Sequence, residues 1–225
     1  MLIMQLLRNT VGRKMIVAVS GLLLIGFVVA HLLGNVTIFF GTEALNAYGV
    51  HLRRLGPLLW SFRIGLLAAV VVHIYFGLLL TLENRAAKST AYARNKPRRA
   101  TLAGKSMIYS GLLLAVFVVY HLLHFTFRTT NPEISHFIDA AGRPDIFQMV
   151  VLSFRQPFIS LLYLVGMAAL GLHLMHGIGS FFQTIGANDE DSLPLLGRFG
   201  QVAALLLALG FSSIPILIYF RFVTI

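Results

Sequence analysis

Six histidines lie inside long apolar stretches of this sequence, where an imidazole ring needs a polar partner. His173 and His176, for example, occur in the segment MAALGLHLMHGIGS (167–180). A neutral imidazole carries one hydrogen-bond donor and one acceptor, and burying such a group unpaired in hydrocarbon costs about 2–7 kcal/mol. The other four are His31, His73, His121 and His124. Ionisable groups inside apolar spans are rare and usually functional, so we expect these rings to share a partner.

The composition indicates a membrane protein. Of the 225 residues, 57% are hydrophobic and only 12% are charged, whereas a soluble domain carries about 25% charged residues. The chain has no cysteine, which excludes a thiolate metal site, a cysteine-ligated iron–sulphur cluster and c-type haem attachment within it. The formal net charge of +10 is better explained by where the basic residues lie relative to the spans than by nucleic-acid binding.

Five apolar segments are each long enough to cross about 30 Å of hydrocarbon as a helix. They cover residues 15–40, 57–82, 106–127, 157–182 and 200–220. Strands are excluded because no segment alternates apolar and polar residues between short turns. We find no low-complexity segment and no convincing internal repeat. The sequence therefore predicts an all-α membrane protein, a five-helix bundle forming a single domain over residues 1–225.

Basic residues in the connections predict the orientation. The lead-in contains Arg8, Arg13 and Lys14, and residues 83–105 contain seven basic residues and one acid. Both should lie in the cytoplasm, which places the C-terminus outside, and the first span should be retained rather than cleaved as a signal. In the outer connections we expect a short surface helix over 41–56 and a helix start at Asn131 and Pro132.

Depth along the spans sorts four of the buried histidines into two pairs. His31 and His121 each lie about two-thirds of the way along an outward-running span, and His73 and His173 lie about two-thirds along inward-running spans. Each pair therefore shares a depth, with about 10–15 Å between the two levels. His51 and His136 lie in the outer connections, where we expect solvated loop histidines.

A six-coordinate haem can take two imidazoles from facing helices as its axial ligands. Two such pairs would hold two haems. The second ring nitrogen of each ligand must then find its own hydrogen-bond partner. Small residues flank the proposed ligands and leave room for a macrocycle, although ordinary close helix packing explains them equally well. They are Ala69 and Gly77 around His73, Ala169 and Gly177 around His173, and Gly34 after His31.

Two other classes of protein use intramembrane histidines. A membrane di-iron oxygenase, such as a lipid desaturase, is suggested by HLLH (121–124) and HLMH (173–176). That chemistry needs about eight ligands gathered at one membrane surface, and these clusters face opposite halves of the bilayer. A proton-coupled transporter would need buried acids and repeated halves. No span carries an acid in its central portion, and we find no repeated halves in the sequence.

Three segments carry a family resemblance: VAHLLGNVTIFFGTEALNAYG (29–49), YHLLHFTF (120–127) and LHLMHGIGSFFQTIG (172–186). They resemble the cytochrome b (b558-type) membrane-anchor subunit of bacterial succinate:quinone oxidoreductase, the five-helix type with two b haems. The resemblance implies His31 with His121 as ligands of the outer haem iron and His73 with His173 of the inner one. It implies that His124 and His176 are not iron ligands but lie at a haem edge or form a hydrogen bond to a ligand.

The resemblance also implies partners. A flavoprotein and an iron–sulphur subunit would dock on the cytoplasmic face of the bacterial inner membrane, and the acceptor would be a quinone, often menaquinone. The basic connection 83–105 is either part of that dock or a plain positive-inside loop. Whether the complex runs as succinate dehydrogenase or as fumarate reductase stays open, as does a higher oligomer of the whole complex. Some relatives have a carboxylate where this chain has Gly171, which puts proton coupling by that route in doubt.

Haem propionates need hydrogen-bond donors, and depth alone suggests some. The donors that we expect for the outer haem are Arg128, Arg53 and Arg54, and those for the inner haem are Ser20, Arg13 and Lys105.

Overall fold

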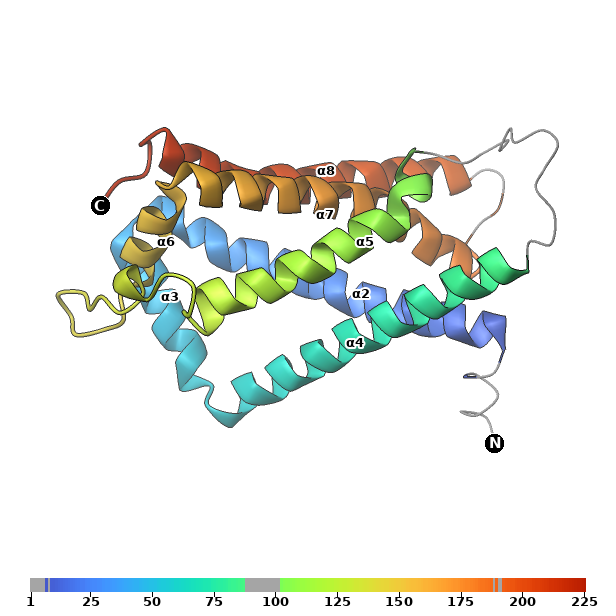
Figure 1. Ribbon diagram of the computed structural model, residues 1–225, viewed down its shortest axis with the longest axis horizontal. Helices are drawn as coiled ribbons and strands as arrows, with labels where there is room; N and C mark the ends of the chain where they lie inside the picture. The colour runs from blue at the N-terminus through green and yellow to red at the C-terminus, as the bar shows by residue number, and fades with distance from the viewer. Residues whose placement is uncertain (1–6, 8, 88–101, 188, 190–191) are drawn as a thin grey trace.

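The computed structural model of the chain describes residues 7, 9–87, 102–187, 189 and 192–225, without the side chains of 102–105. Within these residues the regular structure is helical, apart from one isolated β-bridge between Ile138 and Pro144. Five helices in this part are long and apolar enough to cross a membrane (Figure 1). The multi-pass, all-helical prediction is therefore confirmed.

The spanning helices match the predicted segments and mostly extend beyond them. α2 covers Thr10–Asn35, with a 3-10 turn η1 at Val36–Phe40, and α4 covers Pro57–Ala86. α5 covers Leu102–His121, with a π-helical turn η2 at Leu122–Thr126. α7 covers Pro157–Thr184 and α8 covers Ser192–Tyr219.

Local signals explain several of these helix ends. α2 begins five residues before the predicted span because the Asn9 side chain accepts a hydrogen bond from the backbone N–H of Gly12. Pro57 and Pro157 occupy the first turns of their helices, as expected. α8 begins eight residues earlier than predicted and continues through Pro215.

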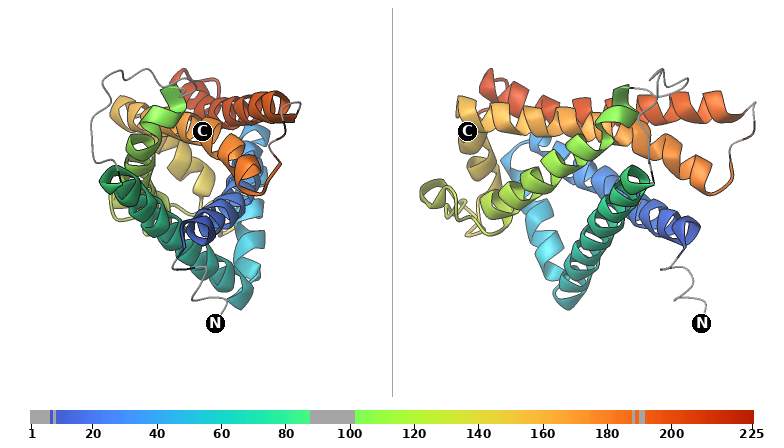
Figure 2. Two further views of the ribbon diagram at one scale, coloured as in Figure 1. Left: turned by 90° about the vertical axis from the view of Figure 1, so that its right-hand side faces the viewer. Right: turned by 45° about the vertical axis from the view of Figure 1, so that its right-hand side comes forward.

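Four spans surround the centre of the bundle and the fifth lies outside it. α2 packs along α4, α5 packs along α7, and α7 also packs along α2 and, most extensively, along α8. α4 and α5 meet at few positions. Figure 2 shows this arrangement in end view, with α8 against α7 and away from α4.

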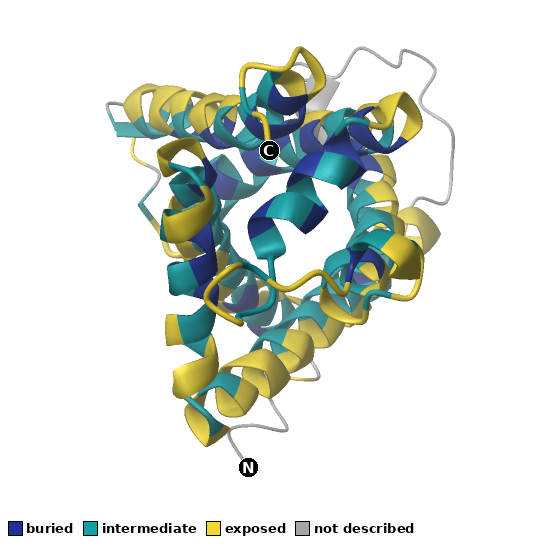
Figure 3. Ribbon diagram, turned by 90° about the vertical axis from the view of Figure 1, so that its left-hand side faces the viewer, coloured by how far each residue is buried: buried dark blue, intermediate teal, exposed yellow. Residues whose placement is uncertain are grey.

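One end of the bundle carries a cap, which we call the α3/α6 end because these two short helices form most of it. α3 covers Thr42–Arg54 and confirms the expected surface helix. The third connection differs from expectation, because Asn131 makes no side-chain cap and Pro132 begins only a 3-10 turn, η3 (Pro132–Ile134). An unpredicted helix, α6 (Ile146–Phe154), follows, and its residues are buried or half-buried (Figure 3).

Hydrogen bonds and ion pairs hold the parts of this cap together. The fully buried amide of Asn46 on α3 donates to Asp139 and Asp145 and accepts from the backbone N–H of Phe147. Arg143 donates to Glu43 at 2.6 Å and to Asp139 at 2.8 Å. These contacts tie α3 to the connection before α6.

The apolar core is one-sided. Its larger cluster joins α3, α6, α7 and α8 at the α3/α6 end, and a smaller one joins α7 to α8. Neither cluster has a fully buried member on α4 or α5. The buried members of these two clusters therefore lie mostly on α6, α7 and α8 rather than on α4 and α5.

Candidate functional site

The structure brings together the same histidine rings that depth along the spans pairs. His31 of α2 faces His121 of α5, with ring centroids 5.8 Å apart and ring planes at 87°. His73 of α4 faces His173 of α7, with centroids 6.2 Å apart and planes at 69°. Each pair takes one ring from α2 or α4 and one from α5 or α7.

These spacings match two imidazoles on opposite sides of one metal ion. An imidazole nitrogen binds a metal at about 2.0–2.1 Å. A five-membered ring with bonds of about 1.35 Å has its atoms about 1.15 Å from its centroid. Two ligands in line across one ion therefore have centroids about 6.3–6.5 Å apart. The observed separations are 5.8 and 6.2 Å. Within the described residues, the two rings of a pair form no hydrogen bond to each other.

The distance between the two histidine pairs can be measured along helix α2, which contacts both. Ser20 on α2 contacts His73, and His31 lies eleven residues further along the same helix. At 1.5 Å per residue the two levels are about 16 Å apart along the helix axis, slightly more than the sequence suggests.

The hydrogen bonds of His73 determine which of its nitrogens carries the proton. Nδ1 lies 3.2 Å from the Val17 carbonyl oxygen and 3.2 Å from Ser20 Oγ. A carbonyl oxygen only accepts, so Nδ1 donates. Ser20 donates its own proton to the carbonyls of Ile16 and Val17. Nε2 of His73 therefore keeps its lone pair, as a metal ligand requires.

His173 has the same arrangement on the neighbouring helix pair. Ser110 Oγ donates to the Met107 carbonyl at 3.0 Å and so accepts from Nδ1 of His173 at 3.3 Å. The sequence interpretation missed Ser110. It also assigned Ser20 to a haem propionate, whereas the structure uses this hydroxyl for the imidazole and for backbone carbonyls.

These matched contacts overturn the prediction that the chain lacks an internal repeat. SGLLLIGFVVAHLL (20–33) and SGLLLAVFVVYHLL (110–123) agree at eleven of fourteen positions. AAVVVHIYFG (68–77) and AALGLHLMHG (168–177) follow at similar distances. The repeat escapes a search by hydropathy because all the spans are apolar, but the spacing from Ser-Gly to histidine would have revealed it.

The glycine after each of these serines allows the imidazole to approach the helix. A Cβ atom at Gly21 would stand 3.1 Å from Cε1 of His73, and one at Gly111 would stand 3.1 Å from Cε1 of His173. Both values lie below the ordinary contact distance of about 3.5–4.0 Å. Helix α2 therefore seats the His73 ring, and α5 seats the His173 ring.

The other glycines near the histidines differ in whether their surroundings are open or closely packed. A Cβ at Gly77 would meet nothing within 4 Å, and one at Gly177 would meet only the end of Met107 at 3.9 Å. Close packing therefore does not explain these two glycines. It does explain Gly34, where a Cβ would overlap the ring of Tyr48.

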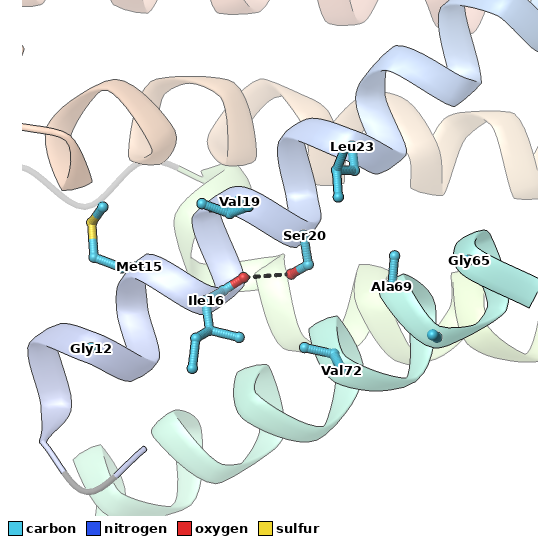
Figure 4. Close-up of a pocket in the computed structure, with 10 residues that line it drawn as sticks. Gly12, Met15, Ile16, Val19, Ser20, Leu23, Gly65, Ala69 and Val72 are labelled. Carbon is cyan, nitrogen blue, oxygen red and sulfur yellow. Dashed lines mark hydrogen bonds between the residues drawn. The ribbon is translucent and has the colours of Figure 1, made fainter. Parts of the chain in front are cut away.

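An apolar groove lies between α2 and α4 at the level of the His73–His173 pair. Its volume is about 470 Å³, and Ser20, Ala69 and Val72 are among its lining residues (Figure 4). Neither His73 nor His173 is among its lining residues, so this groove is a surface feature of α2 and α4 and does not mark the space between the two rings.

The His31–His121 pair has more aromatic surroundings. Phe27 stacks on His31 with centroids 5.2 Å apart, and the Asn35 amide lies 3.4 Å from both ring nitrogens of His31. His121 Nδ1 lies 3.3 Å from the hydroxyl of Tyr163, which is also 2.9 Å from Nδ1 of His124.

The two remaining buried histidines do not join a pair. Both ring nitrogens of His124 are engaged, one by Tyr163 and the other by Ser153 at 3.2 Å. His176 is half-buried one turn from His173, and no hydrogen bond to it is recorded among the described residues. His51 and His136 are exposed on the cap.

The predicted donors to the haem propionates differ in the partners that they already have in the structure. Arg13 forms an ion pair with Glu83 of α4, and the side chain of Lys105 lies outside the described residues. Arg128 adopts a left-handed backbone conformation, φ 58°, and donates to the Ser135 carbonyl. Burial, with a smaller contribution from nearby Arg53, lowers the pKa of Arg128.

Arg128 is half-buried and Arg53 is exposed, and two like charges near one another favour a bound anion. A second sign comes from Arg155, whose buried Nε has no hydrogen-bond partner. Arg54 is exposed on α3. All of these arginines lie at the α3/α6 end of the bundle.

The structure also gives a reason for glycine at position 171. A Cβ at Gly171 would already stand 3.2 Å from Cβ of Ala208 on α8. A side chain there would press α7 against α8.

Within the described residues, no group of three or more histidine, aspartate or glutamate side chains is placed to hold a metal ion by itself. The ligand clusters of a di-iron oxygenase therefore find no support in this part of the chain. Comparisons with protein-family models, with curated proteins and with solved structures give no match.

Proposed function

We propose that this chain is a di-haem cytochrome b of the membrane, with His31 and His121 as axial ligands of one haem and His73 and His173 of the other. The ring spacing of the two pairs carries the proposal, because 5.8 and 6.2 Å suit two imidazoles across one iron atom. A haem, when bound, supplies a centre that gains and loses one electron at a time.

The protein residues bind, orient and insulate. The Ser20 and Ser110 hydroxyls, with nearby backbone carbonyls, keep Nδ1 protonated on His73 and His173. This fixes the ring orientation and raises the basicity of Nε2 toward iron. The open faces beside Gly77 and Gly177 leave space for a macrocycle, and Arg128 with Arg53 is suited to a carboxylate at the α3/α6 end.

On the resemblance of residues 29–49, 120–127 and 172–186, we extend the proposal to the anchor subunit of a bacterial succinate:quinone oxidoreductase. The chain would hold the flavoprotein and iron–sulphur subunits at the end opposite the α3/α6 cap. Electrons from succinate would pass to a membrane quinone, with menaquinone as the expected acceptor. The two histidine levels, about 16 Å apart by helix rise, suit an electron path between the two halves of the bilayer.

Visible and EPR spectroscopy of the purified chain tests the haem proposal. We expect two b-type haems per chain after dithionite reduction. Alanine at His31 or His121 should remove one of them, and alanine at His73 or His173 should remove the other. His51→Ala is the matched control, since this ring is exposed, and it should leave both signals intact. A wild-type chain without a b-type band would refute the proposal.

The wider assignment needs its own experiment. Purification of the tagged chain from its native membrane should bring down a flavoprotein and an iron–sulphur subunit, and succinate should then reduce haem in that complex. If the chain contains haem but copurifies with neither subunit, the cytochrome b proposal stands and the succinate:quinone assignment is refuted. If fumarate with a low-potential quinol is the faster direction, the complex works as a fumarate reductase.

A further inference from the structure

A chain of buried hydrogen bonds leads from His121 to the cap helix α6. It runs from His121 Nδ1 to Tyr163 Oη at 3.3 Å and on to His124 Nδ1 at 2.9 Å. From His124 Nε2 it reaches Ser153 Oγ at 3.2 Å, and Ser153 bonds to the Met149 carbonyl at 2.8 Å. His124, Ser153 and Tyr163 are 1%, 0% and 6% exposed, so solvent does not compete for these bonds.

The carbonyl at the end of the chain sets the direction of every bond in it. The Met149 oxygen only accepts, so Ser153 donates to it and has no second proton for His124. His124 Nε2 therefore donates to Ser153, which leaves the lone pair of a neutral His124 on Nδ1. This nitrogen accepts the Tyr163 proton, and the Tyr163 oxygen accepts from Nδ1 of His121. Nε2 of His121 is left with the lone pair.

The opposite direction is unfavourable. If Ser153 donated to His124, two oxygen lone pairs would face each other across the 2.8 Å contact between Ser153 and Met149. The Met149 carbonyl would then keep only the helical N–H of Ser153 as a donor. The opposite direction would also place a proton on Nε2 of His121, where no metal could bind.

We propose that Tyr163, His124 and Ser153 are positioning residues for His121. They lock its tautomer, point Nε2 toward the His31–His121 centre and lower the reduction potential of a haem bound there. This inference rests on the proposed function. A hydrogen bond accepted from Nδ1 makes the imidazole a stronger electron donor, which stabilises the oxidised iron relative to the reduced iron.

The contrast with the other pair makes the inference specific. His73 and His173 each rely on a serine one helix away, with a backbone carbonyl beside it. Within the described residues, His121 alone among the four is held through a second histidine, and its support alone reaches the cap. His124 is also explained in this way: it is buried without being a ligand because it carries the hydrogen bond from Tyr163 to Ser153.

Tyr163→Phe tests this in the full-length haem-loaded protein, with the two reduction potentials as the readout. It removes the acceptor of His121, and we expect the potential of the His31–His121 haem to rise. A change of up to tenfold in the relative stability of its two oxidation states corresponds to about 59 mV. The potential of the His73–His173 haem should not move.

Two further variants separate positioning from structure. Tyr120→Phe is the matched control, because Tyr120 contacts the rings of His124 and Tyr163 but its hydroxyl has no recorded partner in the described part of the chain. It should leave both potentials unchanged. Ser153→Ala removes the end of the bond chain, and should raise the same potential as Tyr163→Phe by a smaller amount.

The outcomes are distinct. An upward shift confined to the His31–His121 haem, larger in Tyr163→Phe than in Ser153→Ala and absent in Tyr120→Phe, supports the inference. Unchanged potentials in Tyr163→Phe, or equal shifts of both haems, overturn it while the di-haem proposal stands. If Tyr163→Phe loses that haem altogether, Ser153→Ala decides, and an unshifted potential there overturns it. A wild-type chain without haem overturns both proposals.

Discussion

Alanine at Gly111 measures how closely the His173 ring must approach α5. The added Cβ would stand 3.1 Å from Cε1 and 3.5 Å from Nδ1 of that ring. To regain a contact of about 3.5 Å the ring must retreat by about 0.4 Å. The bond from Nδ1 to Ser110 is already 3.3 Å long, so this retreat carries it past the limit of a useful hydrogen bond, about 3.5 Å.

The cost follows from these two effects. Overpacking of this size costs about 1–3 kcal/mol, and the lost hydrogen bond adds about 0.5–1.5 kcal/mol. Replacing a glycine inside a helix returns about 0.5–1 kcal/mol. The net loss is about 0.5–4 kcal/mol, which corresponds to roughly 2- to 900-fold weaker haem retention at the His73–His173 pair.

Haem occupancy of each site, measured by reduced spectra and EPR during thermal or detergent challenge, is the assay. Gly21→Ala should have the same effect through His73, because its Cβ stands at the same distance from that ring. Gly26→Ala is the control on α2, since a Cβ there meets nothing within 4 Å. If Gly111→Ala retains haem as firmly as Gly26→Ala, the close seating of His173 is not required and the reasoning is wrong.

Further predictions concern the cap and the helix contacts. Asn46→Leu removes three buried hydrogen bonds and should lower the free energy of unfolding by about 2–5 kcal/mol, read from thermal melts in detergent. Gly166→Ala places a Cβ 2.7 Å from a phenyl ring of α5 and should cost about 1–3 kcal/mol by overpacking, with retained stability as the contrary result. Hydrogen bonds from Arg143 lower the pKa of Glu43, and at Asp139 burial raises the pKa but bonds from Arg143 and Asn46 outweigh it, for a net lowering. Depressed carboxyl pKa values stabilise the folded cap above about pH 4, and this contribution should fade as the pH drops below 4. Arg143→Gln should flatten the acid limb of the melting temperature against pH, and an unchanged limb would contradict the assignment.

Depth along the spans was enough to predict which histidines face one another. Spanning helices run nearly straight between two membrane surfaces, so residues at equal fractions of their spans come to equal heights. His31 with His121 and His73 with His173 follow from this rule alone. The rule says nothing about rotation around the helix axis, and that is why Ser110 and Tyr163 were not predicted beside these rings.

The cap was less accessible from the sequence. α3 is recognisable because residues 41–56 combine a glycine start with spaced apolar positions, and the structure confirms it. α6 was not predicted because IFQMVVLSF (146–154) is a short apolar run followed directly by the next span. Length and periodicity do not separate such a run from a strand or a buried turn. Its capping residue, Asp145, which accepts from the backbone N–H of Gln148, was the available signal.

The repeat explains which features of the site are duplicated and which are not. α2 with α4 and α5 with α7 are two copies of one unit in the same orientation, and each histidine pair takes one ring from each copy. Neither copy can form a pair alone, and α4 and α5 touch little, so a group bound between the rings would join the two copies where side chains do not.

Departures from the repeat mark where the copies have taken different roles. Ser20 and Ser110 occupy equivalent positions and make equivalent bonds. Gly34 and His124 also occupy equivalent positions, but the space at Gly34 is filled by the ring of Tyr48, whereas His124 fills its own place and bonds to Tyr163 and Ser153. The copies therefore agree at the His73–His173 level and differ at the His31–His121 level. Since the repeat relates the two rings within each pair, the His73–His173 level keeps this symmetry in its hydrogen bonds and the His31–His121 level has lost it.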